Sequence, residues 1–160
     1  EGHRRRLHLF DTFEGMPPPG AEDRDIGGVA ADELLADEDR ETGSTWAYGP
    51  LEDVRRNLFS TGYPPELIRF VPGRVEETIP AEAPERIAVL RLDTDWYEST
   101  RHELIHLFPR LSVGGVLIID DYGHWKGARK AVDDYLAATG NRLLLSRIDY
   151  TGRMAVKLDH

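Results

Sequence analysis

Short apolar segments alternate with amphipathic segments over most of the chain. The apolar segments predict β-strands, and one of them, Val116–Ile119, has the continuous apolar character of a strand that is buried on both faces. The amphipathic segments place apolar residues three and four positions apart, which predicts helices. We expect strands at residues 7–10, 68–71, 87–92 and 116–119, and helices at residues 50–61, 100–111 and 126–138.

This alternation of strands and helices predicts an α/β fold with a mostly parallel sheet and helices on both of its faces. Two further strands, at about residues 143–148 and 154–158, flank a linker that contains Gly152, which predicts a C-terminal antiparallel hairpin. Thr100 and Glu103 have the spacing of a capping box, so we expect the second helix to begin there.

Residues 21–49 are the least regular part of the chain. They follow a Pro- and Gly-rich stretch, are rich in carboxylates and contain few large apolar side chains. A short helix around residues 30–35 fits the sequence, but we interpret the region as a mobile, lid-like insertion within a single domain that spans residues 1–160.

Composition excludes several classes of function. The chain has 160 residues, a formal charge of −9 and no cysteine. The negative charge weighs against nucleic acid and anionic membranes as partners, and no apolar run approaches the roughly 20 residues of a membrane span. The lack of cysteine excludes disulfides, thiolate metal sites and a Cys nucleophile, and it fits a cytoplasmic protein.

Acidic residues follow the expected strands at their carboxyl ends. Asp11 follows the first strand, Asp93 and Asp95 follow a central one, and Asp120 and Asp121 follow the next. Ligands bind beyond the carboxyl ends of strands in α/β sheets. Four carboxylates at the carboxyl ends of two neighbouring strands repel each other unless a cation is present. Mg²⁺ or Ca²⁺, which prefer oxygen ligands, would suit them. The ordinary alternative is that each Asp caps a helix or starts a turn.

Other motifs leave the chemistry open at this point. Asp11 either binds a ribose diol or closes a turn. The pair Asp93 and Asp95 also satisfies the short Asp-x-Asp pattern of metal-dependent glycosyltransferases. The chain has no Gly-x-Gly-x-x-Gly loop, no phosphate-binding Gly-x-x-x-x-Gly-Lys loop and no Gly-x-Ser-x-Gly elbow.

Four segments together resemble the macrocin O-methyltransferase family, whose members methylate sugar or aromatic hydroxyls in the biosynthesis of macrolide and aminocoumarin antibiotics. The likeness runs over most of residues 7–135. The segments are Leu9–Pro17 (LFDTFEGMP), Leu92–Thr100 (LDTDWYEST), Gly114–Gly123 (GGVLIIDDYG) and Gly127–Tyr135 (GARKAVDDY).

The resemblance implies a Rossmann-like class I methyltransferase fold, S-adenosylmethionine as the methyl donor and a required Mg²⁺. By position in the matching segments, Asp93, Asp120 and Asp121 resemble the metal ligands of the family. Asp95 resembles the general base that takes the proton of the acceptor hydroxyl.

The donor site is implied in the same way. Asp11 matches the acid that binds the adenosyl ribose, and Gly73 lies where the adenine pocket is usually built. The first strand of the family and its glycine-rich loop should precede Glu1, between the strands at residues 7–10 and 87–92. We therefore expect this chain to be a fragment of a longer enzyme.

Three functions remain as hypotheses: an O-methyltransferase that acts on a sugar or phenolic hydroxyl of a small molecule, a metal-dependent glycosyltransferase, and a non-catalytic metal-binding fragment. In the first, the insertion would close over donor and acceptor, with Trp46 and Tyr48 as candidate acceptor contacts. The sequence leaves the acceptor, the methylated position and the formation of a homo-oligomer open.

Overall fold

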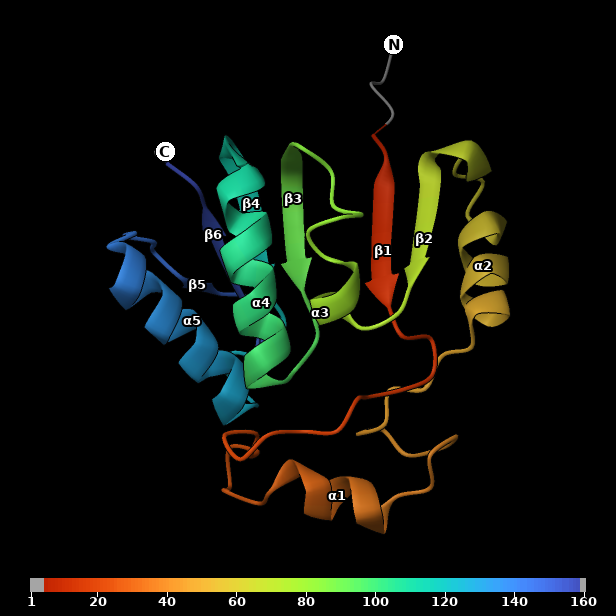
Figure 1. The fold of residues 1–160 in the computed structure, drawn as a ribbon, viewed down its shortest axis with the longest axis vertical. Helices are drawn as coiled ribbons and strands as arrows, with labels where there is room; N and C mark the ends of the chain where they lie inside the picture. Colours follow the sequence, from red (N-terminus) through yellow and green to blue (C-terminus); the bar gives the residue numbers. More distant parts are fainter. Residues whose placement is uncertain (1–4, 159–160) are drawn as a thin grey trace.

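The computed structural model of the protein describes residues 5–158, which form strands and helices in alternation (Figure 1). The predicted strands and helices are present, but the strand predicted at residues 116–119 begins at Leu111, where the end of a helix was expected, and the strand predicted at about residues 143–148 covers only two residues. The elements are β1 (Leu7–Asp11), α1 (Ala31–Asp37), α2 (Leu51–Ser60), β2 (Ile68–Pro72), α3 (Val75–Thr78), β3 (Ile87–Leu92), α4 (Tyr97–Leu107), β4 (Leu111–Ile119), α5 (Lys126–Thr139), β5 (Ser146–Arg147) and β6 (Arg153–Val156).

The strands form two sheets. In one, β1 pairs in parallel with β2; in the other, the order is β3-β4-β6-β5, with β3 and β4 parallel and β6 antiparallel to both β4 and β5. The predicted parallel α/β architecture and C-terminal hairpin are thereby confirmed. In Figure 1, β1 and β3 run side by side in the same direction, but no ladder joins them within residues 5–158.

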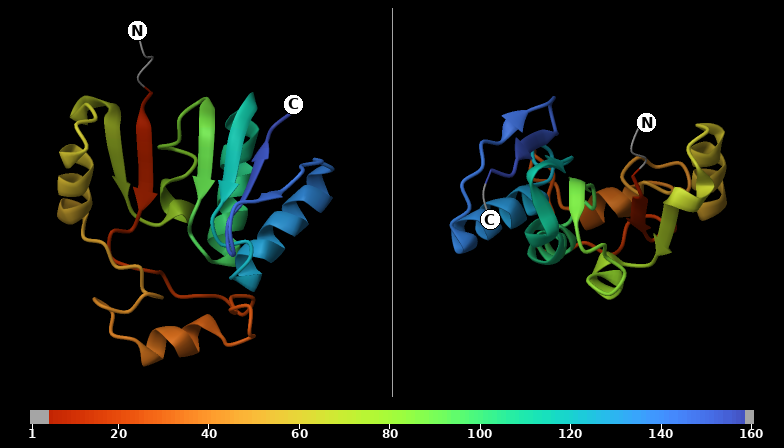
Figure 2. Two further views of the ribbon diagram at one scale, coloured as in Figure 1. Left: turned by 180° about the vertical axis from the view of Figure 1, so that it is seen from behind. Right: turned by 90° about the horizontal axis from the view of Figure 1, so that it is seen from above.

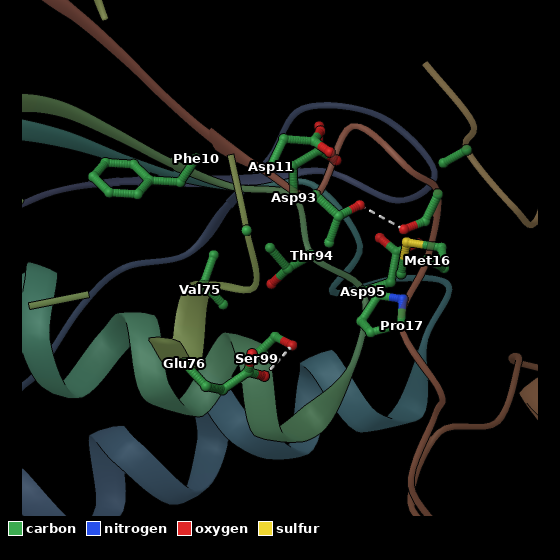
Figure 3. A pocket seen from close by; sticks show the side chains of 14 residues that line it. Phe10, Asp11, Met16, Pro17, Val75, Glu76, Asp93, Thr94, Asp95 and Ser99 are labelled. Carbon is green, nitrogen blue, oxygen red and sulfur yellow. Dashed lines mark hydrogen bonds between the residues drawn. The ribbon is translucent and has the colours of Figure 1, made fainter. Parts of the chain in front are cut away.

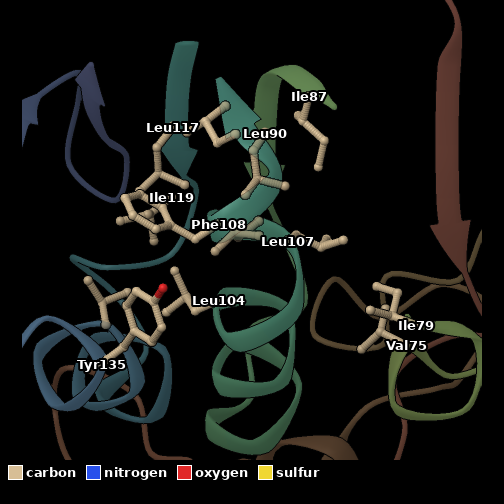
Figure 4. Close-up of a cluster of buried hydrophobic side chains, with 13 residues drawn as sticks. Val75, Ile79, Ile87, Leu90, Leu104, Leu107, Phe108, Leu117, Ile119 and Tyr135 are labelled. Atoms are coloured by element: carbon tan, nitrogen blue, oxygen red, sulfur yellow. The ribbon is translucent and has the colours of Figure 1, made fainter. Parts of the chain in front are cut away.

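The main core lies between the β3–β4 pair and the two long helices α4 and α5 (Figure 4). Leu104 of α4 and Leu117 and Ile119 of β4 are each only 1% exposed, and Val132 of α5 packs in the same cluster. Full burial of one such side chain contributes about 1.5–3 kcal/mol to folding. This packing fixes the carboxyl ends of β3 and β4 relative to the helices that follow them.

The opposite face of the β3–β4–β6 sheet differs from the expectation of helices on both sides. Val89 is 59% exposed and Val156 is 42% exposed, whereas Leu90 beside Val89 is buried. Side chains alternate between the faces of a strand, so the helices cover one face and leave the other open within the described residues (Figure 2).

None of the helices within residues 5–158 is long and apolar enough to cross a membrane.

One predicted helix start is wrong. Helix α4 begins at Tyr97, with Trp96 at the N-cap position, so Thr100 and Glu103 lie inside the helix and form no capping box. Both side chains are buried, because they share the inward face of α4 with Leu104. The spacing of Thr100 and Glu103, which fits a capping box, here places both residues on the buried face of the helix.

Candidate active site

Three carboxylates meet where β3 and β4 end. The two strands pair in register up to Leu92 and Ile119, and the backbone N–H of Asp120 donates to the carbonyl of Leu92 at 2.9 Å. Carboxylate oxygens of Asp93, Asp95 and Asp121 consequently lie within 4.8 Å of one another. The structure thus brings three of the four predicted strand-end acids of β3 and β4 into one cluster.

Asp120 lies beside this cluster and pairs with a cation of the chain itself. The guanidinium of Arg91 is 3.0 Å from Asp93 Oδ2 and 3.0 Å from Asp120 Oδ2, and its Nε donates to Asp120 Oδ1 at 3.3 Å. Arg91 therefore bridges the ends of β3 and β4. Its role was not predicted, although a basic residue two positions before a strand-end acid is a signal that could have been read.

Crowding of these acids shifts their proton affinities. Loss of hydration, followed by the hydrogen-bonded carboxyl of Asp120, raises the pKa of Asp93 to about 7 even though Arg91 acts in the other direction. Burial and the neighbouring carboxyl of Asp121 raise the pKa of Asp95 well above its ordinary value. Burial also raises the pKa of Asp121. A cluster of this kind is stabilised by protons or by a bound cation.

Asp95 sits at the centre of a tight turn. Its φ of +61° lies in the left-handed region, and the backbone N–H of Trp96 donates to the carbonyl of Thr94 at 2.6 Å across it. Such a conformation costs about 1–3 kcal/mol for a residue other than glycine, so it persists only where the surroundings hold it. In this conformation a carboxylate oxygen of Asp95 lies within 4.8 Å of those of Asp93 and Asp121.

Glu103 supports the same turn from inside the protein. The hydroxyl of Thr94 donates to Glu103 Oε2 at 2.8 Å, and Glu103 is only 5% exposed. Burial raises the pKa of Glu103 to about 8, so its neutral acid form prevails at pH 7. Sequence reasoning assigned this residue to a helix cap and missed its position beneath the acidic cluster.

A cavity of about 290 Å³ opens beside the acids (Figure 3). It joins the predicted donor residues Asp11 and Gly73 to the predicted base Asp95, and Asp93 also lines it. Gly73 has a φ of +130°, which a residue with a side chain rarely adopts, and its N–H donates to the carbonyl of Asp11 at 3.0 Å. The carboxyl ends of both sheets therefore contribute to one pocket.

Two polar side chains in the cavity wall were not predicted. The hydroxyl of Ser99 donates to Glu76 Oε1 at 2.7 Å (Figure 3). The other oxygen, Glu76 Oε2, is buried and accepts no hydrogen bond, although Arg74 Nε lies 3.4 Å away. This oxygen remains able to accept a hydrogen bond from a bound molecule.

The insertion forms the floor of a second, larger cavity of about 540 Å³ that shares Met16 and Pro17 with the first. Trp46 lines this cavity, and its indole N–H donates to the carbonyl of Leu35 at 3.0 Å. Tyr48 lines neither cavity and is 38% exposed. Of the two aromatic residues, the structure thus places Trp46 in a cavity wall and Tyr48 outside both cavities.

Curated relatives of this chain are O-methyltransferases. It is 41% identical over 152 residues to 8-demethyl-8-(2,3-dimethoxy-alpha-L-rhamnosyl)-tetracenomycin-C 4'-O-methyltransferase of Streptomyces olivaceus, a match that covers 92% of this chain and 53% of that enzyme. It is 38% identical over 133 residues to demethyldecarbamoylnovobiocin O-methyltransferase of Streptomyces niveus, covering 83% and 48%. The chain therefore spans about half the length of the curated relatives it matches.

Solved structures show the same fold. The O-methyltransferase NovP superposes with a TM-score of 0.79 at 35% identity, over 97% of this chain and 61% of NovP. The apo structure of CalS11, a TDP-rhamnose 3'-O-methyltransferase of calicheamicin biosynthesis, gives a TM-score of 0.60 at 25% identity, over 97% and 60%. The sequence profile described as macrocin O-methyltransferase (TylF) matches residues 1–156. Profile, relatives and fold agree, and the chain belongs to the macrocin O-methyltransferase family.

Proposed function

We propose that this protein transfers a methyl group from S-adenosylmethionine to a sugar or phenolic hydroxyl of a small natural product, in a reaction that requires Mg²⁺. The observation that carries the proposal is the 290 Å³ cavity, which Asp11 and Gly73 line together with the acids Asp93 and Asp95. A donor held at one end and an acceptor hydroxyl held at the other would meet in line, so positioning supplies much of the acceleration. The metal-dependent glycosyltransferase hypothesis finds no support among the relatives named above.

The donor end of the cavity offers a hydrogen-bond acceptor. Asp11 Oδ1 accepts the N–H of Phe13 at 2.6 Å, and Asp11 Oδ2 has no partner within residues 5–158. That oxygen is available to the hydroxyls of a ribose, which is the role we propose for it. Gly73 packs closely against Thr78, whose Cγ2 would lie 3.1 Å from a Cβ at this position, and we propose that its backbone lines the adenine end of the cavity. Bound S-adenosylmethionine supplies an electrophilic methyl carbon.

The acidic cluster fits a hard divalent cation. Carboxylate oxygens are the ligands that Mg²⁺ prefers, and burial together with the neighbouring acid Asp120 raises the pKa of Asp93 to about 7 although Arg91 acts against the shift. We propose Asp93, Asp120 and Asp121 as the ligands, which requires Arg91 to release Asp120. A cation bound there would lower the pKa of the acceptor hydroxyl and orient it.

Asp95 is the proposed general base. Its carboxyl lies in the cavity and close to the proposed ligands Asp93 and Asp121, so a hydroxyl held at the cation site would be within its reach. A base is most effective when its pKa is near the operating pH, and burial together with neighbouring acids shifts the pKa of Asp95 upward, in that direction.

The larger cavity is the proposed acceptor site. It adjoins the donor cavity through Met16 and Pro17, and Trp46 gives it an apolar surface on which a sugar or aromatic ring can pack. Arg40 lies over the Trp46 ring at 5.4 Å and donates to the carbonyl of Glu14, which ties this wall to the segment that follows β1.

We propose a cytoplasmic location for the reaction.

The test uses the chain together with any residues that its gene adds at either end. Methyl gain is measured by mass spectrometry with S-adenosylmethionine, Mg²⁺ and either TDP-rhamnose or demethyldecarbamoylnovobiocin, the compounds named for two relatives. We expect transfer that EDTA abolishes, and a kcat at least about 100-fold lower in Asp95→Asn with Mn²⁺ affinity retained. Transfer that survives EDTA, or a near-normal kcat in this variant, would contradict the metal or the base assignment respectively.

A further inference from the structure

Asp23 is a buried acid for which the reaction above has no use. It lies in the insertion and is only 2% exposed. Its Oδ2 accepts the backbone N–H of Gly20 at 2.6 Å, and its Oδ1 accepts the backbone N–H of Tyr97 at 2.7 Å. Its main chain is bound as well, since its carbonyl accepts the N–H of Ala31 at 2.9 Å. Burial raises the pKa of Asp23, while the two N–H groups act against this shift.

The contact with Tyr97 gives α4 a cap from outside the helix. The first N–H groups of a helix have no partner within it, and the N-cap residue Trp96 makes no side-chain bond to them. Asp23, 74 positions earlier in the sequence, supplies the missing acceptor, and a negative charge is favourable at that end of a helix.

The same segment also binds the residue just before Tyr97. The indole N–H of Trp96 donates to the carbonyl of Pro17 at 2.8 Å. Both residues that follow Asp95, which has a φ of +61°, are therefore hydrogen-bonded to residues 17–23. Lys126 N–H donates to the carbonyl of Arg24 at 2.8 Å, which attaches the start of α5 to the same segment.

Gly127 makes this arrangement sterically feasible. A Cβ at this position would overlap Asp23 Oδ1 and would lie 3.1 Å from the backbone nitrogen of Tyr97. The second residue of α5 must therefore lack a side chain if the carboxylate is to reach α4. Gly127 and Asp23 are two separate positions in the sequence through which the same contact can be broken.

We propose that Asp23 is a positioning residue for the methyl transfer proposed above: it fastens residues 17–31 to the start of α4 and thereby holds Asp95 at the cavity. This inference rests on the proposed function for its catalytic consequence. Docking of the insertion and orientation of the base then form one cooperative unit, so loss of one loosens the other.

Two variants test the contact from opposite sides. The carboxylate of Asp23 accepts hydrogen bonds from the N–H groups of Gly20 and Tyr97 through its two oxygens. In Asp23→Asn one of these oxygens is replaced by an NH₂ group, which cannot accept, so one of the two bonds is lost. Gly127→Ala leaves Asp23 intact but displaces its carboxylate. Alanine favours a helix more than glycine does, so α5 itself is not weakened. Glu22→Gln, which removes the neighbouring exposed charge, is the matched control.

The first measurement is amide hydrogen exchange of the metal-free protein without donor or acceptor. We expect exchange about tenfold faster in both variants at residues 17–31 and also at residues 94–98, with the later turns of α4 unchanged. Glu22→Gln should match the wild type. Faster exchange confined to residues 17–31 would overturn the coupling.

The second measurement separates positioning from general stability. With the active wild type, both variants, assayed well below their own Tm, should show kcat lowered about tenfold or more and KM for S-adenosylmethionine within about twofold. A kcat equal to wild type in both variants would overturn the inference. A wild type without methyl transfer would refute the proposed function, and the exchange experiment would still decide whether Asp23 couples the two segments.

Discussion

The half of the molecule formed by β3, β4, α4 and α5 is held together differently from the half formed by β1, β2, α2 and the insertion. In the first half, each long helix buries several apolar side chains against the sheet, such as Leu104 in α4 and Val132 in α5. In the second half, α2 has no buried residue at all. Both halves contribute to the same cavity, through Asp93 and Asp95 on one side and Asp11 and Gly73 on the other.

The difference shows which parts of the site are fixed by packing. Close-packed side chains hold the strand ends that carry the acids, and such packing resists displacement. The insertion is attached by hydrogen bonds to single backbone groups, including those of Pro17 and Arg24, and by an apolar cluster, separate from the main core, in which Ala31 and Leu35 pack with Trp96 and Trp125. Regions with fewer buried apolar contacts open at lower free energy, so we expect the insertion, together with the turn at residues 94–98, to open without unfolding the packed half.

The largest effect should come from a cavity in the packed half. Leu104→Ala removes a side chain that is 1% exposed and should lower the free energy of unfolding by about 2–5 kcal/mol. Phe59→Ala, on α2, removes a ring that is 44% exposed and should cost roughly 1 kcal/mol or less. Denaturant unfolding of both variants measures the difference. Equal losses would show that the two halves are packed alike.

Glu103 tests the same half through pH. Its pKa in the fold, about 8, exceeds its ordinary value of 4.5. Between these two values the folded protein binds more protons than the unfolded chain, so this residue lowers the free energy of unfolding as pH rises, until the effect levels off above pH 8. Glu103→Gln should remove this dependence and become more stable than wild type through that window.

The gain in free energy of unfolding in Glu103→Gln should reach a few kcal/mol at most, since one pKa unit corresponds to about 1.4 kcal/mol. Urea unfolding at a series of pH values measures it. Leu107→Ala, which truncates a buried apolar side chain on the same helix, should shift stability equally at every pH. A difference between Glu103→Gln and wild type that stays constant with pH would contradict the raised pKa.

The sequence predicted the packed half well because packing leaves a periodic pattern. Strand and helix ranges and the neighbouring ends of β3 and β4 followed from apolar spacing, while the family resemblance assigned the roles of the acids. The irregular half was predicted only as a lid-like insertion with a short helix, now seen as α1. Its attachment depends on backbone carbonyls and on Asp23, and hydrogen bonds to distant backbone groups leave no periodicity. Glu103 was misread for a related reason, since its spacing from Thr100 fits both a cap and a buried face.

A substitution of Arg91 tests how much of the negative charge of the acidic cluster is compensated by a cation of the chain itself. In Arg91→Gln, loss of the guanidinium charge should raise the pKa of Asp93 above its value of about 7, by roughly one unit, because a nearby cation stabilises the ionised form. Carboxyl ¹³C shifts of the metal-free protein, followed by NMR across the pH range, measure this. A lower or unchanged pKa would mean that Arg91 is not the cation that compensates Asp93.

The smallest effect should be confined to the insertion. Trp46→Phe keeps an aromatic ring but loses the hydrogen bond from the indole to the carbonyl of Leu35, which is worth about 1 kcal/mol. Because the insertion opens separately, hydrogen exchange at residues 31–46 should become several-fold faster while the global unfolding midpoint stays unchanged. Tyr48→Phe, which alters no hydrogen bond found in residues 5–158, is the matched control. A fall of the global midpoint in Trp46→Phe would show instead that the insertion unfolds together with the packed half, and that the two halves form one cooperative unit.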